Sequence, residues 1–482
     1  MAIGRHTMRE WHRVAIEAVR ATPGVALIGA IVLDHASAGV DGRFDPAVAA
    51  ASAAPPIPGL PEVRFTPDVD VLLDFSGEDP PGMPPLGVWR YGFGEGSAAA
   101  GGASGTLVRL YRLTPRRDQA VVLHEGWYRA RTSAAWGTRS VPLRVAPWCA
   151  RVLRQLVAGH VDPLHGPCGC VDECDLREPP PRDHPWGARV ADAAREWLRR
   201  QRWTVGIVPL TIEQIMQQGG MPEPAWLRGQ PSDRFYADPF PVARIGNRIH
   251  LLVEEYRYRS RQKVLTSLDV AVEGRLLGDA RDCGLPAGAS YPFLLRVDGA
   301  LLCLPETFRA RRLAAFRRDA DHTWSFAGEL LRDFPVVDAT LVAHDGSWWL
   351  FCTKQGDEDQ TELHLFFASD WRGPWAPHPL NPVKSDTRSS RPAGACFTID
   401  DVLYRPAQNC ARRYGAGITI NRIVQMTRAQ FRESAVLELR PADGSLWPDG
   451  LHTINSFGGV TLVDGLRIER RIGRGAVSAG TL

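Results

Sequence analysis

Five polar or aromatic residues recur at similar intervals through the second half of the chain. They are Asp238, Tyr291, Asp338, Arg391 and His452, and they lie 53, 47, 53 and 61 positions apart. Each begins a stretch that leads into apolar residues, and the first three stand eight positions before a turn glycine. Carboxylates can act as general acid or base, and guanidinium groups bind anionic substituents. Brought together, these side chains would form a polar site.

A second polar set follows the apolar run that comes after each turn. It consists of Glu254 or Glu255, Glu306, Lys354, Arg405 and Gln408. Because the second strand of a hairpin runs back to the end where the first began, this set would return to the five lead residues. The sequence therefore predicts one site built from residues scattered over more than two hundred positions.

The spacing near fifty residues indicates the elements that position this site. Asp-Gly between two apolar runs, as at Asp298, Asp345 and Asp464, is a strong hairpin signal. A period of this length corresponds to four strands, which is typical of a propeller blade. We predict an all-β, five-bladed propeller over residues 203–475, with residues 203–208 pairing with the last blade to close the ring.

The first half of the chain predicts a different architecture. Trp11, Val14, Ala15 and Ala18 share one face of a helix over residues 8–20. Apolar runs at 25–33 and 69–75 then predict strands, so we expect an α/β domain over residues 1–155. A Pro-rich, charged passage in residues 156–202 predicts a linker that contains a helix.

Composition limits the class of protein. An apolar content of 44% and a charged content of 23% are typical of a globular chain, and a net charge of +3 gives no reason to expect a nucleic-acid partner. The run at 25–33 is too short to span a bilayer. Nine cysteines, mostly single within apolar runs, favour a reduced, cytoplasmic protein. No cofactor is predicted, and the oligomeric state cannot be deduced from the sequence.

One cluster of metal-ligand types lies in the predicted linker. Cys168, Cys170 and Cys174 stand near His160 and His165, and thiolates and imidazoles are the usual ligands of zinc. The two-residue gap of a zinc knuckle and a matching second pair are both absent from this stretch. We therefore predict no metal site, and zinc binding by these cysteines stays an open alternative.

The motifs of the second half together resemble a known family of propellers. The chain looks like the five-bladed furanosidase-type glycoside hydrolases of family 43, and more closely like the propeller in the N-terminal part of glucosamine inositolphosphorylceramide transferases and their bacterial relatives. The resemblance rests on Ala237-Asp-Pro, Tyr291-Pro with Pro305-Glu306, Trp348-Trp-Leu-Phe, Gly373-Pro-Trp, Arg391-Pro-Ala-Gly and Tyr404-Arg-Pro-Ala-Gln.

The resemblance implies roles for particular residues. Asp238 matches the general base of the hydrolases, and Asp338 matches the carboxylate that tunes the acid or holds the sugar. At the position of the hydrolases' acidic Glu, this chain has Arg391, so we consider Glu306 as the acid. Arg391 and Arg405 suit a phosphate or carboxylate on the substrate. The other expected contacts to substrate are Glu254, Tyr291, Lys354, Gln408 and His452, while Glu306 with Arg405 is alternatively a structural ion pair.

Residues 87–111 of the first half resemble the core of formyltransferase-like domains. The stretch contains a Gly-Val-Trp strand, an expected turn with Gly92, Gly94 and Gly96, and a following apolar run. That family works with an Asn, His and Asp set, and no Asn–His pair stands near this turn. The resemblance implies a degenerate domain.

Three functions remain open at this point. The first is a carbohydrate-active enzyme, a glycosyl transferase or hydrolase with Asp238 as base. The second is a non-catalytic sugar-binding propeller, which the missing acidic Glu favours. The third is a formyl or acyl transferase with its chemistry in the N-terminal domain.

Overall fold

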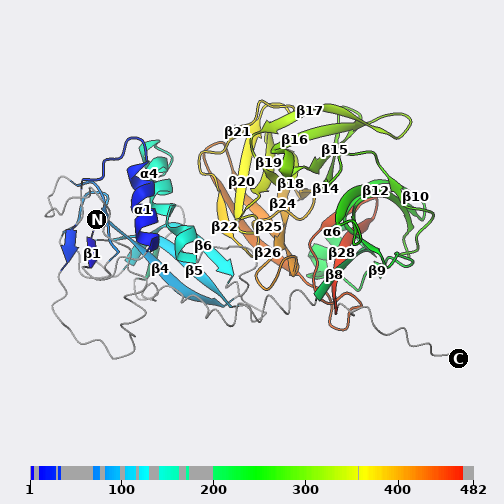
Figure 1. The fold of residues 1–482 in the computed structure, drawn as a ribbon, viewed down its shortest axis with the longest axis horizontal. Coiled ribbons are helices and arrows are strands. Elements are labelled where there is room, and N and C mark those ends of the chain that lie inside the picture. Colours follow the sequence, from blue (N-terminus) through cyan, green and yellow to red (C-terminus); the bar gives the residue numbers. More distant parts are fainter. Residues whose placement is uncertain are drawn as a thin grey trace. The chain divides into compact units, whose positions relative to one another are not determined.

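The computed structural model describes residues 2–4, 10–28, 31–33, 69–75, 82–97, 104–114, 119–129, 141–161, 170–172, 199–356 and 358–470. The chain divides into two compact units (Figure 1). Unit 1 comprises residues 1–130 and 137–184, and unit 2 comprises residues 131–136 and 185–482. Each unit is described by itself below. None of the described helices has the length and apolar character needed to cross a membrane.

Unit 1 combines helices with a mainly antiparallel sheet. Strands β4 (Val88–Ser97), β5 (Ser104–Leu113) and β6 (Gln119–Arg129) are consecutive and antiparallel, with β3 (Leu72–Leu73) parallel to β4 and β7 (Cys170–Asp172) on β6. A separate parallel pair joins β1 (Ala2–Gly4) and β2 (Ile31–Leu33). Helices α1 (Glu10–Arg20), α3 (Val141–Val145) and α4 (Trp148–Val157) complete the described elements. The alternation expected for an α/β domain is therefore not confirmed.

Two local predictions for unit 1 are corrected. Gly92, Gly94 and Gly96 lie within β4, paired with β5, and do not form a Gly-rich turn. A Cβ at Gly94 would lie 4.0 Å from the Leu107 carbonyl oxygen, an ordinary contact, so the pairing of β4 with β5 does not require glycine at this position. The strand expected over 25–33 is reduced to β2, since Val25 to Ile28 are not in a strand and Ile28 is exposed. The predicted helix is confirmed as α1, which buries Trp11 and Ala15.

Unit 2 is almost entirely β-structure in a propeller-like arrangement of sheets. The first sheet holds β10 (Arg234–Ile245), β11 (Arg248–Arg257), β12 (Gln262–Ala271) and β13 (Arg281–Asp282). The second holds β14 (Ser290–Val297), β15 (Ala300–Glu306), β16 (Arg312–Arg318) and β17 (Trp324–Arg332). The fourth holds β23 (Phe397–Ile399), β24 (Val402–Asn409), β25 (Gly417–Met426) and β26 (Phe431–Leu439).

The closing sheet joins the two ends of unit 2. Strand β28 (Val460–Arg470) pairs with β27 (Ile454–Phe457) and with β8 (Arg199–Val208), which carries β9 (Ala225–Trp226) on its other edge. Helix α6 (Ile212–Gln218) connects β8 and β9. Trp203 is registered with Leu466 and Val208 with Thr461. The prediction that residues 203–208 close the ring by pairing with the last repeat is confirmed.

The third repeat departs from the predicted pattern. It has three long strands, β18 (Val336–His344), β19 (Ser347–Lys354) and β20 (Glu362–Ala368), followed by the short β21 (Ala376–Pro377) and β22 (Lys384–Asp386), which both pair with β20. Prolines at 374, 377, 379 and 382 interrupt this stretch, and proline cannot donate to a ladder. The predicted count of five blades is therefore wrong: the structure has four four-stranded blades.

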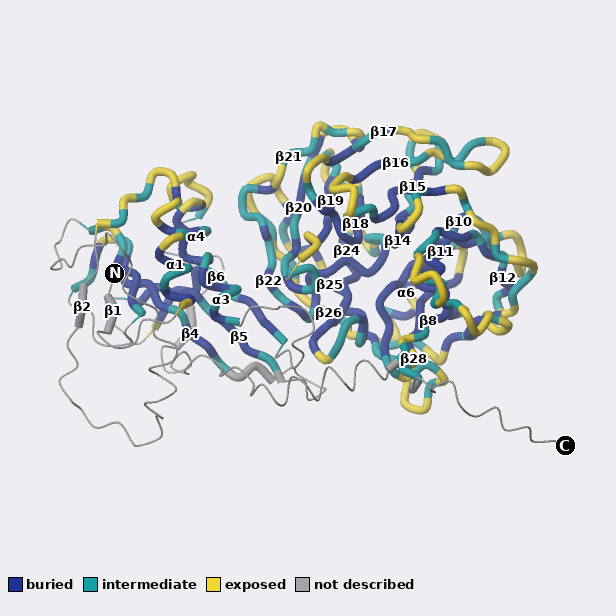
Figure 2. Tube along the Cα trace, in the orientation of Figure 1, coloured by how far each residue is buried: buried dark blue, intermediate teal, exposed yellow. Residues whose placement is uncertain are grey.

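Hydrophobic clusters fill the space between neighbouring sheets of unit 2. Val205 and Ile207 of β8 pack with Leu251 and Val253 of β11, so the closing sheet packs on the first sheet. Equivalent clusters join the first and second, second and third, third and fourth, and fourth and closing sheets. The inner strands are the most deeply buried part of unit 2 (Figure 2). This cyclic packing positions residues from distant repeats around one centre.

Candidate functional site

Three of the five lead residues share one unusual backbone conformation. Asp238, Tyr291 and Asp338 have φ values of 51°, 41° and 51°. Each lies where the pairing of its strand with the next one shifts register. A left-handed conformation at a non-glycine residue costs about 1–3 kcal/mol and is found preferentially at functional sites. The repeat in the sequence thus encodes a bulge that turns one polar side chain at the start of each inner strand.

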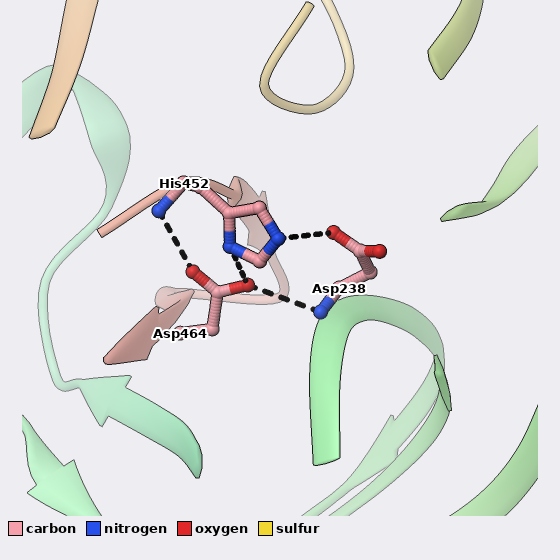
Figure 3. A group of neighbouring side chains, drawn as sticks. All are labelled: Asp238, His452 and Asp464. Carbon is pink, nitrogen blue, oxygen red and sulfur yellow. Dashed lines mark hydrogen bonds and ion pairs between the residues drawn. The ribbon is translucent and has the colours of Figure 1, made fainter. Parts of the chain in front are cut away.

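Asp238 is held by two donors and by a backbone contact (Figure 3). Thr453 Oγ1 donates to Asp238 Oδ1 at 2.6 Å, and His452 Nε2 lies 3.3 Å from the same oxygen. The Asp238 N–H donates to Asp464 Oδ2 at 3.1 Å. Asp238 Oδ2 accepts no hydrogen bond within the described part of the chain. One carboxylate oxygen is therefore fixed and the other is left for a ligand.

Asp464 organises the group around Asp238. Its Oδ1 accepts from the backbone N–H groups of His452 and Thr453 at 2.9 and 3.0 Å, and its Oδ2 lies 2.6 Å from His452 Nδ1. Asp464 is completely buried in β28. The prediction that Asp464 lies in a hairpin turn is wrong. The turn is at Gly458 and Gly459, which both have positive φ, and Asp464 pairs with Val205 inside the sheet.

His452 is a protonated imidazole between two carboxylates. Burial lowers its pKa, but Asp464 and Asp238 outweigh burial, and the net result is a pKa raised to about 9. Burial raises the pKa of Asp238 above its ordinary value. The charge of His452 opposes this rise, and the charge of Asp464 adds to it. The raised pKa of His452 favours its imidazolium form near neutral pH.

The same three residues have the spacing of a metal site. One ligand atom each from Asp238, His452 and Asp464 lies within 4.8 Å of the others. Nε2 of His452 lies 3.3 Å from Asp238 Oδ1 and Nδ1 lies 2.6 Å from Asp464 Oδ2, although the buried Nδ1 has no partner with hydrogen-bond geometry among the described residues. The protonated His452 that the two carboxylates favour pairs with them as an ion-paired triad, whereas a neutral His452 would offer one ring nitrogen to a cation. The side chains of Cys168, Cys170 and Cys174 lie outside the described residues.

Asp338 forms a second polar group with two residues of the fourth repeat. Its Oδ2 accepts from Arg391 Nε at 2.6 Å and from Gln408 Nε2 at 2.8 Å. Burial raises the pKa of Asp338 well above its ordinary value; Arg391 opposes this, and Glu306 and Asp238 add to it. Its Oδ1 accepts no hydrogen bond from a described residue. Arg391 also lies 3.7 Å from Asp359 and over the Tyr414 ring.

Glu306 and Glu254 complete the acidic centre. Glu306 accepts from Ser290 Oγ at 2.9 Å and from the Asp338 N–H at 3.1 Å. Lys263 donates to Glu254 at 3.0 Å. Burial raises the pKa of Glu254, Lys263 lowers it, and both Asp238 and Glu306 raise it further. Glu254 is registered with Ala237 beside Asp238, and Glu306 accepts from the Asp338 N–H. These four buried carboxylates are called the acidic pit below: Asp238, Glu254, Glu306 and Asp338.

Three further predicted site residues have different positions. The Tyr291 hydroxyl is fully buried, bonded to Thr340 Oγ1 at 2.9 Å and accepting from the Gly394 N–H at 2.7 Å, so it ties neighbouring repeats together. Lys354 is exposed and lies over the Phe334 ring. Arg405 is fully buried, but it binds Glu433 at 2.6 Å and the carbonyls of neighbouring serines.

Lys354 and Arg405 were predicted to contact the substrate, but neither lies in the acidic pit. The alternative ion pair between Arg405 and Glu306 is also wrong, because Arg405 pairs with Glu433 of its own sheet. Sequence analysis missed Lys263, Thr453 and Asp464. Lys263 offered one signal, since it is one of three lysines in a chain whose other basic residues are arginines.

A cavity of about 520 Å³ lies between β9 and residues 442–447 of unit 2. It is lined by residues that include Glu223, Trp226, Arg228, Leu446 and Trp447. None of the predicted site residues lines it.

Part of unit 2 is similar to part of a plant transferase. Residues 227–443 match the family described as "Glucosamine inositolphosphorylceramide transferase 1, N-terminal". Proteins named glucosamine inositolphosphorylceramide transferase 1 are 31% identical over 216 residues in Oryza sativa subsp. japonica and 30% identical over 217 residues in Arabidopsis thaliana. Each alignment covers 43% of this chain and 28% of the plant protein. The chain thus spans just over a quarter of these relatives.

The matched region includes Asp238, Asp338 and Arg391 but ends before His452 and Asp464. It supports the propeller resemblance drawn from the sequence. The formyltransferase-like resemblance of residues 87–111 gains no support, because the match begins at residue 227. These relatives are plant proteins, so they do not support the expectation of bacterial ones.

Solved structures show only partial likeness. An α-L-arabinofuranosidase from Podospora anserina is 10% identical, covers 46% of this chain and 76% of its own, and has a TM-score of 0.36. A family 43 β-xylosidase/α-arabinofuranosidase from a compost microbial metagenome is 12% identical, covers 49% of this chain and 90% of its own, and has a TM-score of 0.35. These TM-scores are too low to support a fold assignment, so the description of the fold rests on the strand pairing given above.

Proposed function

We propose that unit 2 acts on a carbohydrate, moving a glycosyl group in the acidic pit with Asp238 as general base. The observation that carries the proposal is the asymmetry of the Asp238 carboxylate. Its Oδ1 is held by Thr453 and His452, and its Oδ2 accepts no hydrogen bond from a described residue. A base fixed through one oxygen is oriented to take a proton through the other.

The proposed step needs a proton donor on the opposite side of the glycosidic bond. Asp338 takes this role, because burial raises its pKa and Oδ1 is free to carry the proton while Oδ2 accepts from Arg391 and Gln408. Asp238 removes the proton of an acceptor hydroxyl, whose oxygen bonds to the anomeric carbon. The bond to the leaving oxygen breaks, and that oxygen receives the proton of Asp338.

Transfer is favoured over hydrolysis by the relatives. The plant relatives carry the word transferase in their names, and the family match over residues 227–443 includes both Asp238 and Asp338. We extend sugar transfer to this chain as part of the proposal, with the acceptor hydroxyl belonging to another molecule and not to water. The sugar itself is left open.

A non-catalytic sugar-binding propeller is the second candidate. Both oxygens of Glu306 accept hydrogen bonds, from Ser290 and from the Asp338 backbone. Since both oxygens are engaged within the protein, neither is left to face a leaving group, and we do not assign Glu306 the role of proton donor considered from the sequence. A pit without a working acid would bind a sugar and release it unchanged.

The proposal is tested by replacing Asp238 with Asn after a screen of glycosides and nucleotide sugars has found a turned-over substrate. Asp238→Asn should lower turnover by at least about 10³-fold, while the dissociation constant changes by less than about threefold. The matched control is Asp298→Asn, since Asp298 has the same φ of 51° but lies in an exposed hairpin turn. Equal turnover in both variants would contradict the role of Asp238. Binding without turnover in the unmodified protein would favour the second candidate.

A further inference from the structure

A band of arginines lies beyond the acidic pit at the same end of unit 2. On the first sheet it contains Arg234 and Arg257, which are directly paired, and the neighbouring exposed Arg259 and Arg261. On the closing sheet it contains Arg200, Arg202 and Arg467, with Arg202 paired to Arg467. These seven residues are called the arginine rim below.

The registers place the rim at the end of the strands where the pit lies. Ala237, next to Asp238, is paired with Glu254, and Arg234 with Arg257 lies three residues further toward the start of β10. In the closing sheet, Arg467 lies three residues beyond Asp464 along β28. At about 3.3 Å per residue, both parts of the rim are roughly 10 Å beyond the pit carboxylates.

Contacts across the seam make the two parts one surface. The Arg200 guanidinium lies 3.8 Å from the centre of the Tyr258 ring, and the Tyr258 hydroxyl donates to the Gln201 carbonyl at 3.0 Å. Tyr258 follows Arg257 directly and packs edge-on against Phe235 of β10. The arginines of the closing sheet therefore adjoin those of the first sheet.

The rim carries positive charge in excess. Its seven arginines are accompanied by three carboxylates, Asp233, Glu255 and Glu469, which leaves four positive charges, against a net charge of +3 for the whole chain. Arg259, Arg261 and Arg467 are exposed and form no hydrogen bond or ion pair with another described residue. These three guanidinium groups are available to a ligand.

The arginines of the pit are not available in this way. Arg391 is bound to Asp338, and Arg405 is bound to Glu433 and two carbonyls. The sequence predicted that these two residues bind an anion of the substrate, but each already has a buried carboxylate partner. A planar fork binds phosphate through two parallel hydrogen bonds, and the rim offers three unoccupied forks side by side on adjoining sheets.

We infer that the arginine rim binds a phosphate group carried by the saccharide whose sugar ring occupies the acidic pit. This inference rests on the proposed function, because it takes the pit as the sugar site. The ligand class is a phosphorylated saccharide long enough to place its phosphate roughly 10 Å from Asp238. The rim then provides affinity for the charged part of the substrate, and the pit provides the chemistry.

The test measures binding and not turnover, so its outcome does not depend on whether Asp238 acts as a base. The probes are D-glucose 6-phosphate, D-glucose, inorganic phosphate, and phosphatidylcholine vesicles with and without phosphatidylinositol. The rim variant combines Arg259→Gln, Arg261→Gln and Arg467→Gln. The control variant combines Arg281→Gln, Arg317→Gln and Arg332→Gln, which removes the same charge from arginine side chains exposed by 73%, 61% and 79% elsewhere in unit 2.

The dissociation constant of D-glucose 6-phosphate should rise about tenfold or more in the rim variant and less than twofold in the control. D-glucose should bind the rim variant and the control variant equally. Raising the salt concentration from about 20 mM to about 500 mM should remove most of the rim's contribution to the binding of D-glucose 6-phosphate. Equal binding of the sugar phosphate by both variants would overturn the inference. So would inorganic phosphate binding as tightly as the sugar phosphate, or rim-dependent binding of phosphatidylinositol vesicles alone.

The two proposals fail separately. Loss of sugar-phosphate binding in the rim variant, together with full turnover in Asp238→Asn, would retain the rim and reject the base. Unchanged binding in the rim variant, together with collapse of turnover in Asp238→Asn, would retain the base and reject the rim.

Discussion

The acidic pit and the arginine rim lie roughly 10 Å apart along the same strands, yet they treat charge in opposite ways. In the pit, charged side chains are buried and most have a partner, such as Arg391 with Asp338 or Lys263 with Glu254. At the rim, three guanidinium groups are exposed and have no hydrogen-bonded partner among the described residues. Buried pairs specify geometry and are costly to break, whereas exposed charges contribute little to stability and remain free to bind.

The largest difference in stability should come from Asp464. Asp464→Asn removes the charge that faces His452 Nδ1 and places an amide where three backbone N–H groups converge. We expect the free energy of unfolding to fall by about 3–5 kcal/mol, measured by urea denaturation. The exposed Asp443 provides the control, and Asp443→Asn should change stability by less than about 0.5 kcal/mol. A similar, small effect in both variants would remove Asp464 from the centre of the pit.

Arg405 should contribute to the stability of unit 2 by an amount comparable to that of Asp464. Arg405→Met leaves Glu433 buried with only Lys384 as its cationic partner. The free energy of unfolding should fall by about 3 kcal/mol or more, without loss of sugar affinity at a temperature where the variant is folded. Arg440→Met, which breaks a partly exposed pair with Glu438, should cost less than about 1 kcal/mol. A specific loss of affinity in Arg405→Met would return this residue to the site.

The pH dependence of stability should reveal the His452 ion pairs. The folded pKa of His452 is raised to about 9 from an ordinary value of 6.5. Its contribution is therefore complete below pH 6.5 and is lost as the pH rises through about 9, a loss of about 3 kcal/mol. Urea denaturation between pH 6 and pH 9.5 measures this slope, and His452→Gln should flatten it. An unchanged slope in that variant would show that His452 is not held in its charged form.

The smallest effect on stability should be at the rim. The variant with Arg259→Gln, Arg261→Gln and Arg467→Gln should unfold within about 1 kcal/mol of the unmodified protein, because these side chains are exposed and have no partner to lose. Differential scanning calorimetry at low salt checks this expectation. A loss of several kcal/mol would mean that the rim is part of the scaffold and would end the contrast with the pit.

The sequence was sufficient for the features that repeat. Equal spacing of Asp238, Tyr291 and Asp338 from their turn glycines reflects one bulge built three times, so the shared geometry could be predicted. The closure of the ring by residues 203–208 followed from an apolar segment without a local partner. The blade count was wrong because the proline-rich end of the third repeat cannot supply ladder donors to a regular fourth strand.

The parts that the sequence could not provide depend on pairing between distant segments. Asp464 is followed by glycine, so it matched the strongest local hairpin signal, and only its register with Val205 of β8 places it inside a sheet. Arg405 was expected in the pit because its partner Glu433 lies 28 positions away on another strand. Side chains on one strand alternate between two faces, and the face cannot be assigned until the neighbours are known.

The central claim is most directly tested by a crystal structure of the Asp238→Asn variant with the saccharide that most raises its melting temperature. We predict density for a sugar ring in contact with residue 238 and with Asp338, and density for a phosphate near Arg259 or Arg467 when the saccharide carries one. A saccharide bound instead in the cavity lined by Trp226 and Trp447, with the acidic pit filled only by water, would contradict the account.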